Sequence, residues 1–423
     1  MKVTSKETNT YTRELSISVQ WSEVEEYFEA VVARYRRNVK LPGFRKGKVP
    51  RSQVMNQFGA EIEADFAQES VERLYTLALD EQDLHPVNRA EVKDLKFAQG
   101  SDFSFTATFE VEPEVVLPKY ARKLKVDRNI YLSDDEDVER YLQDLRQHQA
   151  ELRTVESGSE EGHLLLVDMQ ELDETGYPII NKKVEDRYIK IGDGVFGGDN
   201  LDRLLGLKVD DSVRITVSTN RGPTLYELTI KNVQEEILPD VDENFIKSVD
   251  PEAETEEVLR TNIAKNIKEK LERDSEEQLK ENIISWFVEQ TKLEVPPSMI
   301  ESYLDNLIDN IRSRDGQSLD EEKFRNEMRS SSERNIKWYL IQKALIEAEH
   351  IAVNDEELQS EVTTIIHSMG RQTREVERYY KKPSNRENLR NRLVEKKLFA
   401  HLKSFAKIND VEIKTSELRS QDS

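Results

Sequence analysis

A short stretch near the N-terminus concentrates positive charge in an otherwise acidic chain. Between Val31 and Ala60 there are eight basic residues and no acidic ones, whereas the 423-residue chain has 84 acidic and 62 basic residues, a net charge of -22. The eight are Arg34, Arg36, Arg37, Lys40, Arg45, Lys46, Lys48 and Arg51. Such side chains bind phosphates, so the stretch could contact RNA. The negative net charge of the chain has little effect on such a contact, because charges more than about 8 Å apart are screened at physiological salt.

The centre of this basic stretch, residues 41–50, is predicted to be a loop. Its two prolines and two glycines are incompatible with a continuous helix or strand. Phe44 lies beside Arg45 and Lys46, and an exposed ring next to two cations suits contact with RNA and a protein surface together. Two alternatives remain open from composition: a solvated basic turn, and an RNA-binding regulatory protein that uses this loop alone.

The run Gly43-Phe44-Arg45-Lys46-Gly47-Lys48-Val49-Pro50 is similar, at every fixed position, to the ribosome-docking signature G-F-R-x-G-x-x-P of the trigger factor family. Two further segments resemble that family: residues 238–246, which contain Leu-Pro-Asp and later Phe-Ile, and residues 295–300, Val-Pro-Pro-Ser-Met-Ile. Together with the order of the predicted domains, the resemblance covers nearly the whole chain.

The resemblance implies a cytoplasmic, ATP-independent chaperone that holds unfolded nascent polypeptides. It would dock on the large ribosomal subunit near the exit tunnel, on protein and rRNA, and could form a homodimer when free. The ribosome-binding residues it implies are Gly43, Phe44, Arg45, Lys46, Gly47 and Pro50. The family's links to protein transport and cell division are left open by the residues themselves.

The segments around the loop predict an α+β domain over residues 1–118. Ser22 and Glu25 have the spacing of a capping box, which predicts the start of a helix whose apolar stripe continues to Val39. A second helix would begin after Pro50. Apolar and polar residues alternate over 15–19 and over 103–111, as in half-buried strands.

Residues 119–160 and 161–238 are predicted to form a linker and a β-rich domain. The linker would be a strand followed by a charged helix with a narrow apolar stripe. Short strands punctuated by Gly and Pro turns fill the second segment. The resemblance implies that this domain is an FKBP-like peptidyl-prolyl isomerase. Such a site needs no catalytic nucleophile, only an apolar, aromatic-lined pocket that favours a twisted prolyl amide.

The isomerase pocket implied by the resemblance is eroded in this chain. The family has an Ile-Pro-Gly-aromatic-Glu run where this chain has Gly197 in place of the apolar residue and Asn200 in place of the aromatic one. The flap before the last strand is reduced to about residues 219–223. We therefore expect weak or absent isomerase activity, with Tyr188 and Phe196 as the side chains that could rebuild part of a pocket. An active isomerase is the alternative function.

Residues 239–423 are predicted to be an extended all-α chaperone domain with arms, which makes the whole chain an α+β multidomain protein. Helices are expected over 298–314, 319–350, 355–368 and 387–406, besides a long one that carries Leu259, Ile263 and Ile267. Narrow apolar stripes between charged faces are typical of arms that share little core. Ile283, Ile284 and Phe287 are candidate client-binding residues, with ordinary helix packing as the alternative.

The residue types argue against several other classes of site. The chain has no cysteine, its six histidines lack ligand spacing, and no G-x-x-x-x-G-K-S/T loop occurs, so we expect no metal, no cofactor and no catalytic residue. The N-terminus is not apolar, and no run of about 18 apolar residues occurs. We therefore expect no membrane partner.

Overall fold

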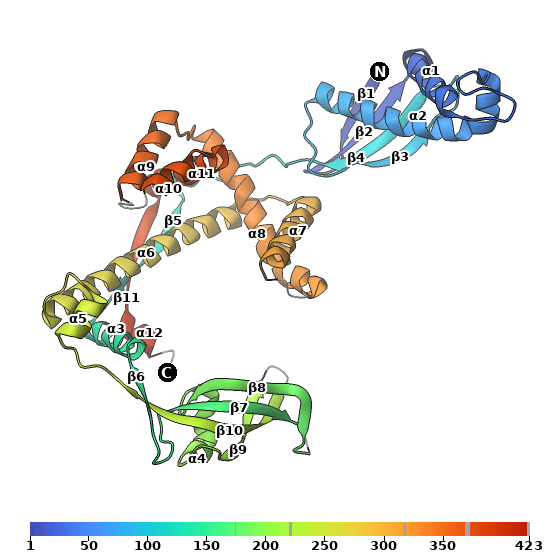
Figure 1. The fold of residues 1–423 in the computed structure, drawn as a ribbon. Coiled ribbons are helices and arrows are strands. Elements are labelled where there is room, and N and C mark those ends of the chain that lie inside the picture. Colours follow the sequence, from blue (N-terminus) through green and yellow to red (C-terminus); the bar gives the residue numbers. More distant parts are fainter. Residues whose placement is uncertain (174, 220–221, 316–318, 369–372, 421–423) are drawn as a thin grey trace. The chain divides into compact units, whose positions relative to one another are not determined.

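The computed structural model describes residues 1–173, 175–219, 222–315, 319–368 and 373–420 (Figure 1). The chain divides into two compact units, one made of Met1–Asp127 with Gln278–Asn409 and the other of Arg128–Glu277 with Asp410–Ser423. Each unit has buried hydrophobic clusters of its own. No helix in the described part of the chain is long and apolar enough to cross a membrane.

The N-terminal part of the first unit is an antiparallel sheet covered by two helices. The strands β1 (Lys2–Glu7), β2 (Thr12–Val19), β3 (Glu91–Lys96) and β4 (Phe103–Glu110) have the order β1-β2-β4-β3. Helices α1 (Trp21–Asn38) and α2 (Arg51–Gln82) lie on one face (Figure 1). Every second residue of β4 is buried, which confirms the alternation predicted there.

Helix α1 begins earlier than its sequence suggests, so the predicted capping box at Ser22 and Glu25 is wrong. The N-cap is Gln20, whose backbone N–H donates to Glu23 Oε2 at 3.2 Å. The reason is the short junction with β2: Val19 is buried at the end of the strand, and Trp21 already packs on the ring of Phe28 at a centroid distance of 5.4 Å. The helix also ends at Asn38, so the predicted stripe stops one residue short of Val39.

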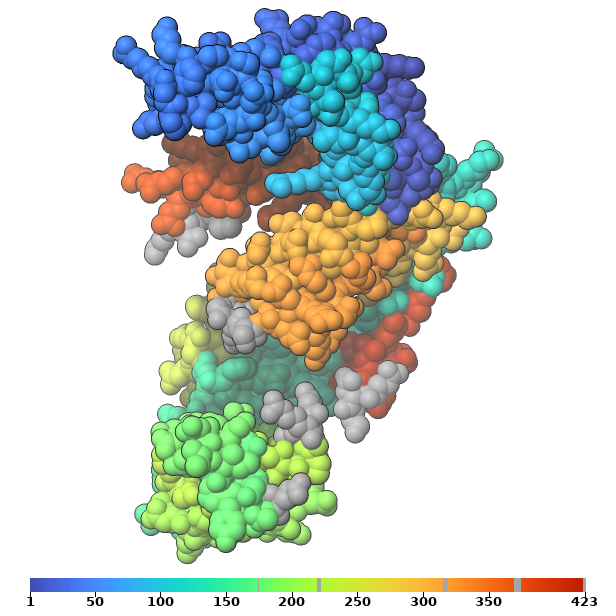
Figure 2. Space-filling model, turned by 90° about the vertical axis from the view of Figure 1, so that its right-hand side faces the viewer, coloured from blue at the N-terminus to red at the C-terminus, as the bar shows by residue number. Residues whose placement is uncertain are grey.

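The C-terminal part of the first unit is helical, as predicted. It comprises α7 (Pro297–Asp315), α8 (Glu321–Ala348), α9 (Asp355–Ser368), α10 (Thr373–Tyr380), α11 (Pro383–Phe405) and the second half of α6 (Glu256–Gln290). α7 and α8 pack side by side (Figures 1 and 2). One buried cluster joins α6, α8 and α11 with Leu124 and Val126. Helix α10 was not predicted, because it is only eight residues long.

The second unit holds the β-rich domain and the part of the predicted linker that follows Asp127. Strands β6 (Glu151–Thr154), β7 (Leu164–Leu172), β8 (Pro178–Lys190), β9 (Ser212–Thr219) and β10 (Gly222–Ile237) form one antiparallel sheet in which β7 and β9 both flank β10. Helices α3 (Asp135–His148), α5 (Glu243–Val249) and the first part of α6 share another buried cluster. Of the shortened flap, residues 220 and 221 lie outside the described residues.

The region after residue 239 is not entirely helical, because it contains the strand β11 (Lys407–Lys414), which pairs with β5 (Lys125–Leu132). The short helix α12 (Thr415–Arg419) then anchors the C-terminal segment to the start of α3. Thr415 Oγ1 donates to Leu132 O at 3.0 Å, and Arg419 Nη2 lies 2.7 Å from Asp134 Oδ2. This guanidinium is the main reason that the pKa of Asp134 is held below its usual range.

A carboxylate in the first unit links three segments and makes stability depend on pH. Glu349 accepts a hydrogen bond from the Tyr120 hydroxyl, and its other oxygen lies 2.7 Å from His401 Nε2. The Tyr120 hydrogen bond first, and His401 second, lower the pKa of Glu349 below its ordinary 4.5. The stability that Glu349 contributes is therefore complete above pH 4.5 and is lost as the pH falls through the lowered pKa.

We expect Glu349→Gln to lower the melting temperature at pH 7 and to reduce the fall in melting temperature on acidification below pH 4.5. The reason is that glutamine is neutral at every pH. Thermal melts of both proteins at a series of pH values measure the effect. If the two proteins lose melting temperature in parallel below that pH, Glu349 does not carry this pH dependence.

Candidate functional site

The loop between α1 and α2 presents its central residues to solvent. Phe44 is 43% exposed, a high value for a large apolar side chain, and Arg45 and Lys46 are also exposed. Two successive turns build the loop: Phe44 N donates to Leu41 O at 3.1 Å, and Lys48 N donates to Arg45 O at 2.9 Å. Gly43 and Gly47 have φ angles of 87° and 79°, a region where other residues are strained. The two glycines therefore allow the turns that project the ring.

The end of the loop is anchored in the domain core. Val49 is fully buried among the side chains of the N-terminal cluster, and Arg36 Nε donates to Val49 O at 3.1 Å. Pro50 then precedes α2, where its fixed φ suits a helix start. Val49 was not singled out from the sequence, since one valine between Lys48 and Pro50 shows no periodicity. The exposed tip is therefore followed directly by a residue that is buried in the core.

The eight basic residues of this region differ in their partners, and Arg36 and Arg37 donate to the backbone oxygens of Val49 and Ala33. Arg34 pairs with Glu69 at 2.7 Å and Arg51 with Glu29, so these two join α1 to α2. Lys40, Arg45, Lys46 and Lys48 form no ion pair with any residue in the described ranges. These four cations have no acidic partner among the described residues. We call residues 40–50, which include them and Phe44, the docking loop, after the role that is proposed for it below.

The residues predicted to line an isomerase pocket differ in exposure. Tyr188 on β8 is 52% exposed, whereas Phe196, in the 3₁₀ turn Gly194–Phe196, packs against the core of the β-rich domain. Asn200 is nearly buried, and its Nδ2 donates to Val195 O and to Thr216 O, both at 2.8 Å. Its Oδ1 accepts from Thr216 N at 3.3 Å. Asn200 therefore joins the turn to β9 and leaves no open floor at this position.

Gly197 is required by the same closed turn. A Cβ at this position would lie 2.6 Å from the backbone oxygen of Gly192, closer than real Cβ contacts. The apolar residue that the family pattern has here cannot be accommodated without a backbone shift. Gly197 and Asn200 thus belong to one arrangement that closes the turn onto the sheet.

The candidate client-binding residues on α6 are part of a core, which corrects the prediction for two of them. Ile283 and Phe287 are fully buried, and only Ile284 is partly exposed. Phe287 packs on the rings of Tyr120 and Trp338 at centroid distances of 5.4 and 6.3 Å. A client could reach Ile283 or Phe287 only after α8 and α11 moved away. The alternative of ordinary helix packing is the one observed.

The chain is similar to known proteins in sequence and in fold. Residues 1–145 match the family model "Bacterial trigger factor protein (TF)", and residues 255–404 match "Bacterial trigger factor protein (TF) C-terminus". The chain is 28% identical over 379 residues to a trigger factor of Bacillus mycoides (strain KBAB4), which covers 84% of this chain and 89% of the relative. It is 28% identical over 396 residues to one of Clostridium botulinum (strain Hall / ATCC 3502 / NCTC 13319 / Type A), which covers 88% and 90%.

A solved structure has a similar fold. It is described as "Promiscuous Substrate Recognition in Folding and Assembly Activities of the Trigger Factor Chaperone". The similarity covers 95% of this chain and 99% of that chain, with a TM-score of 0.50 and 24% sequence identity. At this identity the likeness concerns the fold, in which a helical C-terminal region accompanies a sheet-containing middle region.

Proposed function

The chain belongs to the trigger factor family, and from this premise we propose that it is a ribosome-associated chaperone that holds nascent polypeptides as they emerge. We further propose that it docks through the docking loop, on ribosomal protein and rRNA near the exit tunnel. Its site of action would then be the cytoplasm.

The observation that supports docking is the pairing of an exposed ring with free cations on an anchored loop. Phe44 is 43% exposed beside Arg45 and Lys46, which lack acidic partners in the described part of the chain. Exposing such a ring costs hydration free energy, so a partner that covers it gains apolar burial. The cations can contact phosphates at the same time, which orients the loop on a surface made of protein and RNA.

The absence of a nucleotide-binding motif from the sequence bears on how clients are held and released. Without a G-x-x-x-x-G-K-S/T loop, no nucleotide cycle is expected to drive release. Weak contacts distributed over several helices then allow a client to dissociate as it folds. We propose this ATP-independent holding for the helical part of the chain. That the free protein forms a homodimer stays a prediction from the family resemblance.

Two measurements on the unmodified protein test the proposed function. The first is co-sedimentation with ribosomes through a sucrose cushion, where we expect binding that decreases as salt rises. The second is light scattering of a denatured client diluted into buffer without nucleotide, where we expect less aggregation at equimolar protein. A protein that neither sediments with ribosomes nor reduces scattering is not a ribosome-associated chaperone.

Prolyl isomerisation is the second candidate function, and the contacts of Asn200 argue against it. We propose that residues 161–238 are an FKBP-like domain that acts as a scaffold. Asn200 stands in the position of the family's aromatic residue, and its side-chain amide donates hydrogen bonds to Val195 O and Thr216 O. A prolyl ring would find a hydrogen-bonded amide there instead of an apolar surface.

We expect no catalysis of a refolding reaction limited by proline isomerisation, even at a protein concentration that suppresses aggregation. The matched variant is Asn200→Ala, which opens space but also removes three hydrogen bonds. We expect this variant to destabilise the β-rich domain by about 1–3 kcal/mol and to gain no isomerase activity. A slow phase that accelerates in proportion to the concentration of the unmodified protein would make the chain an isomerase.

A further inference from the structure

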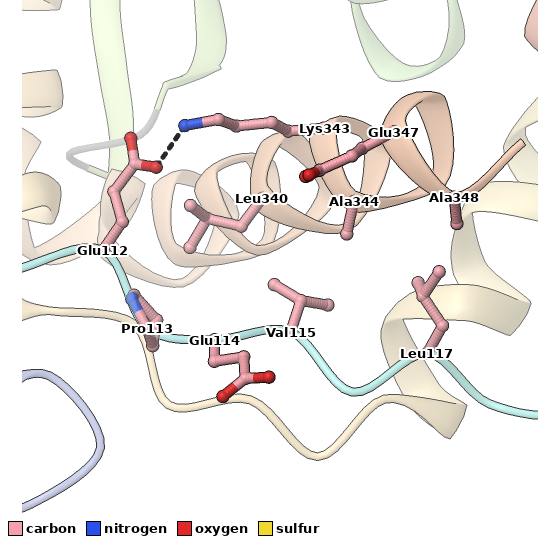
Figure 3. Close-up of a pocket in the computed structure, with 10 residues that line it drawn as sticks. All are labelled: Glu112, Pro113, Glu114, Val115, Leu117, Leu340, Lys343, Ala344, Glu347 and Ala348. Atoms are coloured by element: carbon pink, nitrogen blue, oxygen red, sulfur yellow. Dashed lines mark hydrogen bonds and ion pairs between the residues drawn. The ribbon is translucent and has the colours of Figure 1, made fainter. Parts of the chain in front are cut away.

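A groove runs between helix α8 and the segment that follows the N-terminal sheet. We call that segment, residues 112–117, the connector; it contains neither helix nor strand. The groove has a volume of about 510 Å³ and lies within the first unit. Figure 3 shows Val115 and Leu117 on the side of the connector that faces α8, and Glu114 on the opposite side. This alternation is that of an extended chain.

One wall of the groove is apolar, and its small side chains leave space between α8 and the connector. Leu340, Ala344 and Ala348 come from α8, and the methyl groups of the two alanines extend only a short way towards the connector (Figure 3). Val115 and Leu117 pack against the buried clusters of the helical part, so the connector is held in place. The ion pair of Glu112 with Lys343 fixes its first residue to the same helix. The groove is therefore built from anchored elements.

The backbone of the connector lacks partners. No hydrogen bond joins an N–H or C=O group of residues 112–117 to any other described residue. Val116 is also 76% exposed, among the highest values for a large apolar side chain in this part of the chain. A row of free backbone groups in an extended segment is a template for an additional strand.

The charges around the groove are mainly negative. Glu112, Glu114 and Glu347 line it together with one cation, Lys343, which is already paired with Glu112. The hydrogen bond to the carboxylate of Glu112 raises the pKa of Lys343 above its ordinary value. Glu114 and Glu347 form no ion pair with another described residue. An occupant that carries positive charge would complement this rim.

We propose that the groove binds an extended segment of unfolded polypeptide, which adds to the connector as a strand and places short apolar side chains over Ala344 and Ala348. This inference rests on the proposed function, since it names how one client segment is held. Because Val115 and Leu117 point at α8, a strand added beside the connector points every second side chain at the same helix face. Lysine or arginine next to the apolar residues meets the acidic rim.

Recognition of this kind is tolerant of client sequence. Backbone hydrogen bonds are the same for every residue except proline, and the alanine-lined wall accepts side chains of several shapes. Glu114 and Glu347 add a preference for charge but no requirement for one particular residue. Such a groove binds an extended chain and excludes a folded domain, whose backbone groups are already paired.

Direct binding of synthetic peptides tests the inference in the full-length protein. The probe is a fluorescein-labelled decapeptide of alternating alanine and valine with two lysines at each end, and fluorescence anisotropy gives its Kd. A peptide with the same sequence but N-methylated at every backbone amide cannot donate hydrogen bonds along either edge, so we expect at least tenfold weaker binding. Equal binding of the methylated peptide would overturn strand addition.

Substitutions in α8 locate the site. Ala344→Leu combined with Ala348→Leu fills the groove, and we expect about tenfold weaker binding of the lysine peptide. The control is Asn326→Leu, which adds a leucine on an exposed face of the same helix, 18 residues away and thus about 27 Å along its axis. Equal Kd values for the groove variant and the control would place the peptide elsewhere and overturn the inference.

A charge reversal provides a second variant in case the leucines disturb folding. Glu347→Lys is on the exposed rim, and we expect it to weaken the lysine peptide about threefold and to strengthen a peptide with glutamates at its ends. No change with either peptide would contradict the role of the rim. Ribosome sedimentation and client scattering are measured on the same preparations. If the protein sediments with ribosomes and reduces client scattering but does not bind the peptide, the groove inference fails and the proposed function stands.

Discussion

Replacement of Phe44, Arg45 and Lys46 by alanine is expected to abolish co-sedimentation of the protein with ribosomes. The change removes the one large apolar side chain exposed at the tip of the docking loop and two of its four unpaired cations. Since all three side chains are exposed, the melting temperature should stay within about 1 °C of that of the unmodified protein. Sedimentation through a sucrose cushion, followed by quantification of the pellet, measures the loss.

A control variant with the same change in net charge separates docking from general charge effects. Tyr379, Lys381 and Lys382 are also an exposed aromatic residue with two exposed cations, at the end of α10. Their replacement by alanine alters the net charge equally, and we expect it to leave sedimentation unchanged. Undiminished pelleting of the docking-loop variant would show that the protein reaches the ribosome through another surface.

The salt dependence of binding reports how many of these cations contact phosphate. If Lys40, Arg45, Lys46 and Lys48 all do, a fourfold rise in salt should weaken ribosome binding by about 50- to 100-fold. The alanine variant lacks two of them, so any residual binding should have a salt slope about half as steep. A slope near zero for the unmodified protein would mean that the loop contacts protein alone.

Replacement of Phe287 by alanine is expected to destabilise the helical part of the first unit by about 3–5 kcal/mol. Phe287 lies on α6 and is fully buried against α8 and the segment around Tyr120, so its removal leaves a cavity beside three other aromatic rings. Because the chain has more than one unit, hydrogen exchange of the α6 and α8 amides is the measurement, since it reports local opening. Client holding should decrease only in parallel with this opening.

The matched control for that change is Tyr339→Ala. Tyr339 is an aromatic residue of α8 that is 52% exposed, and we expect its removal to alter stability by less than about 0.5 kcal/mol. A Phe287→Ala protein with unchanged exchange but lost client holding would contradict the buried role of this residue. It would restore α6 as a client-binding surface.

Features that depend on a few neighbouring residues could be predicted from the sequence. The docking loop is an example, because prolines and glycines exclude helix and strand locally, and because the absence of acids over about 30 residues is visible without any partner. The same holds for β4, whose strict alternation of apolar and polar residues matches its burial. The long C-terminal helices follow from apolar residues at helical spacing.

The strands β8 and β11 could not be predicted in this way. β8 is exposed along most of its length and carries charged residues on both faces, so it shows no apolar alternation. β11 is also mostly exposed, and among the described strands it pairs only with β5, which lies about 280 residues earlier in the chain. Both strands form because a neighbouring strand supplies hydrogen-bond partners, and such pairing leaves little trace in local composition.

The amino-acid sequence by itself determined the family, the docking loop with Phe44, Arg45 and Lys46, and the order of helical and sheet regions. Only the tertiary structure decided that Ile283 and Phe287 are core residues, that Asn200 closes a turn, and that a groove lies beside the connector. The physical reason is that backbone preference and charge are local properties, whereas burial and hydrogen bonding depend on segments that are distant in the sequence.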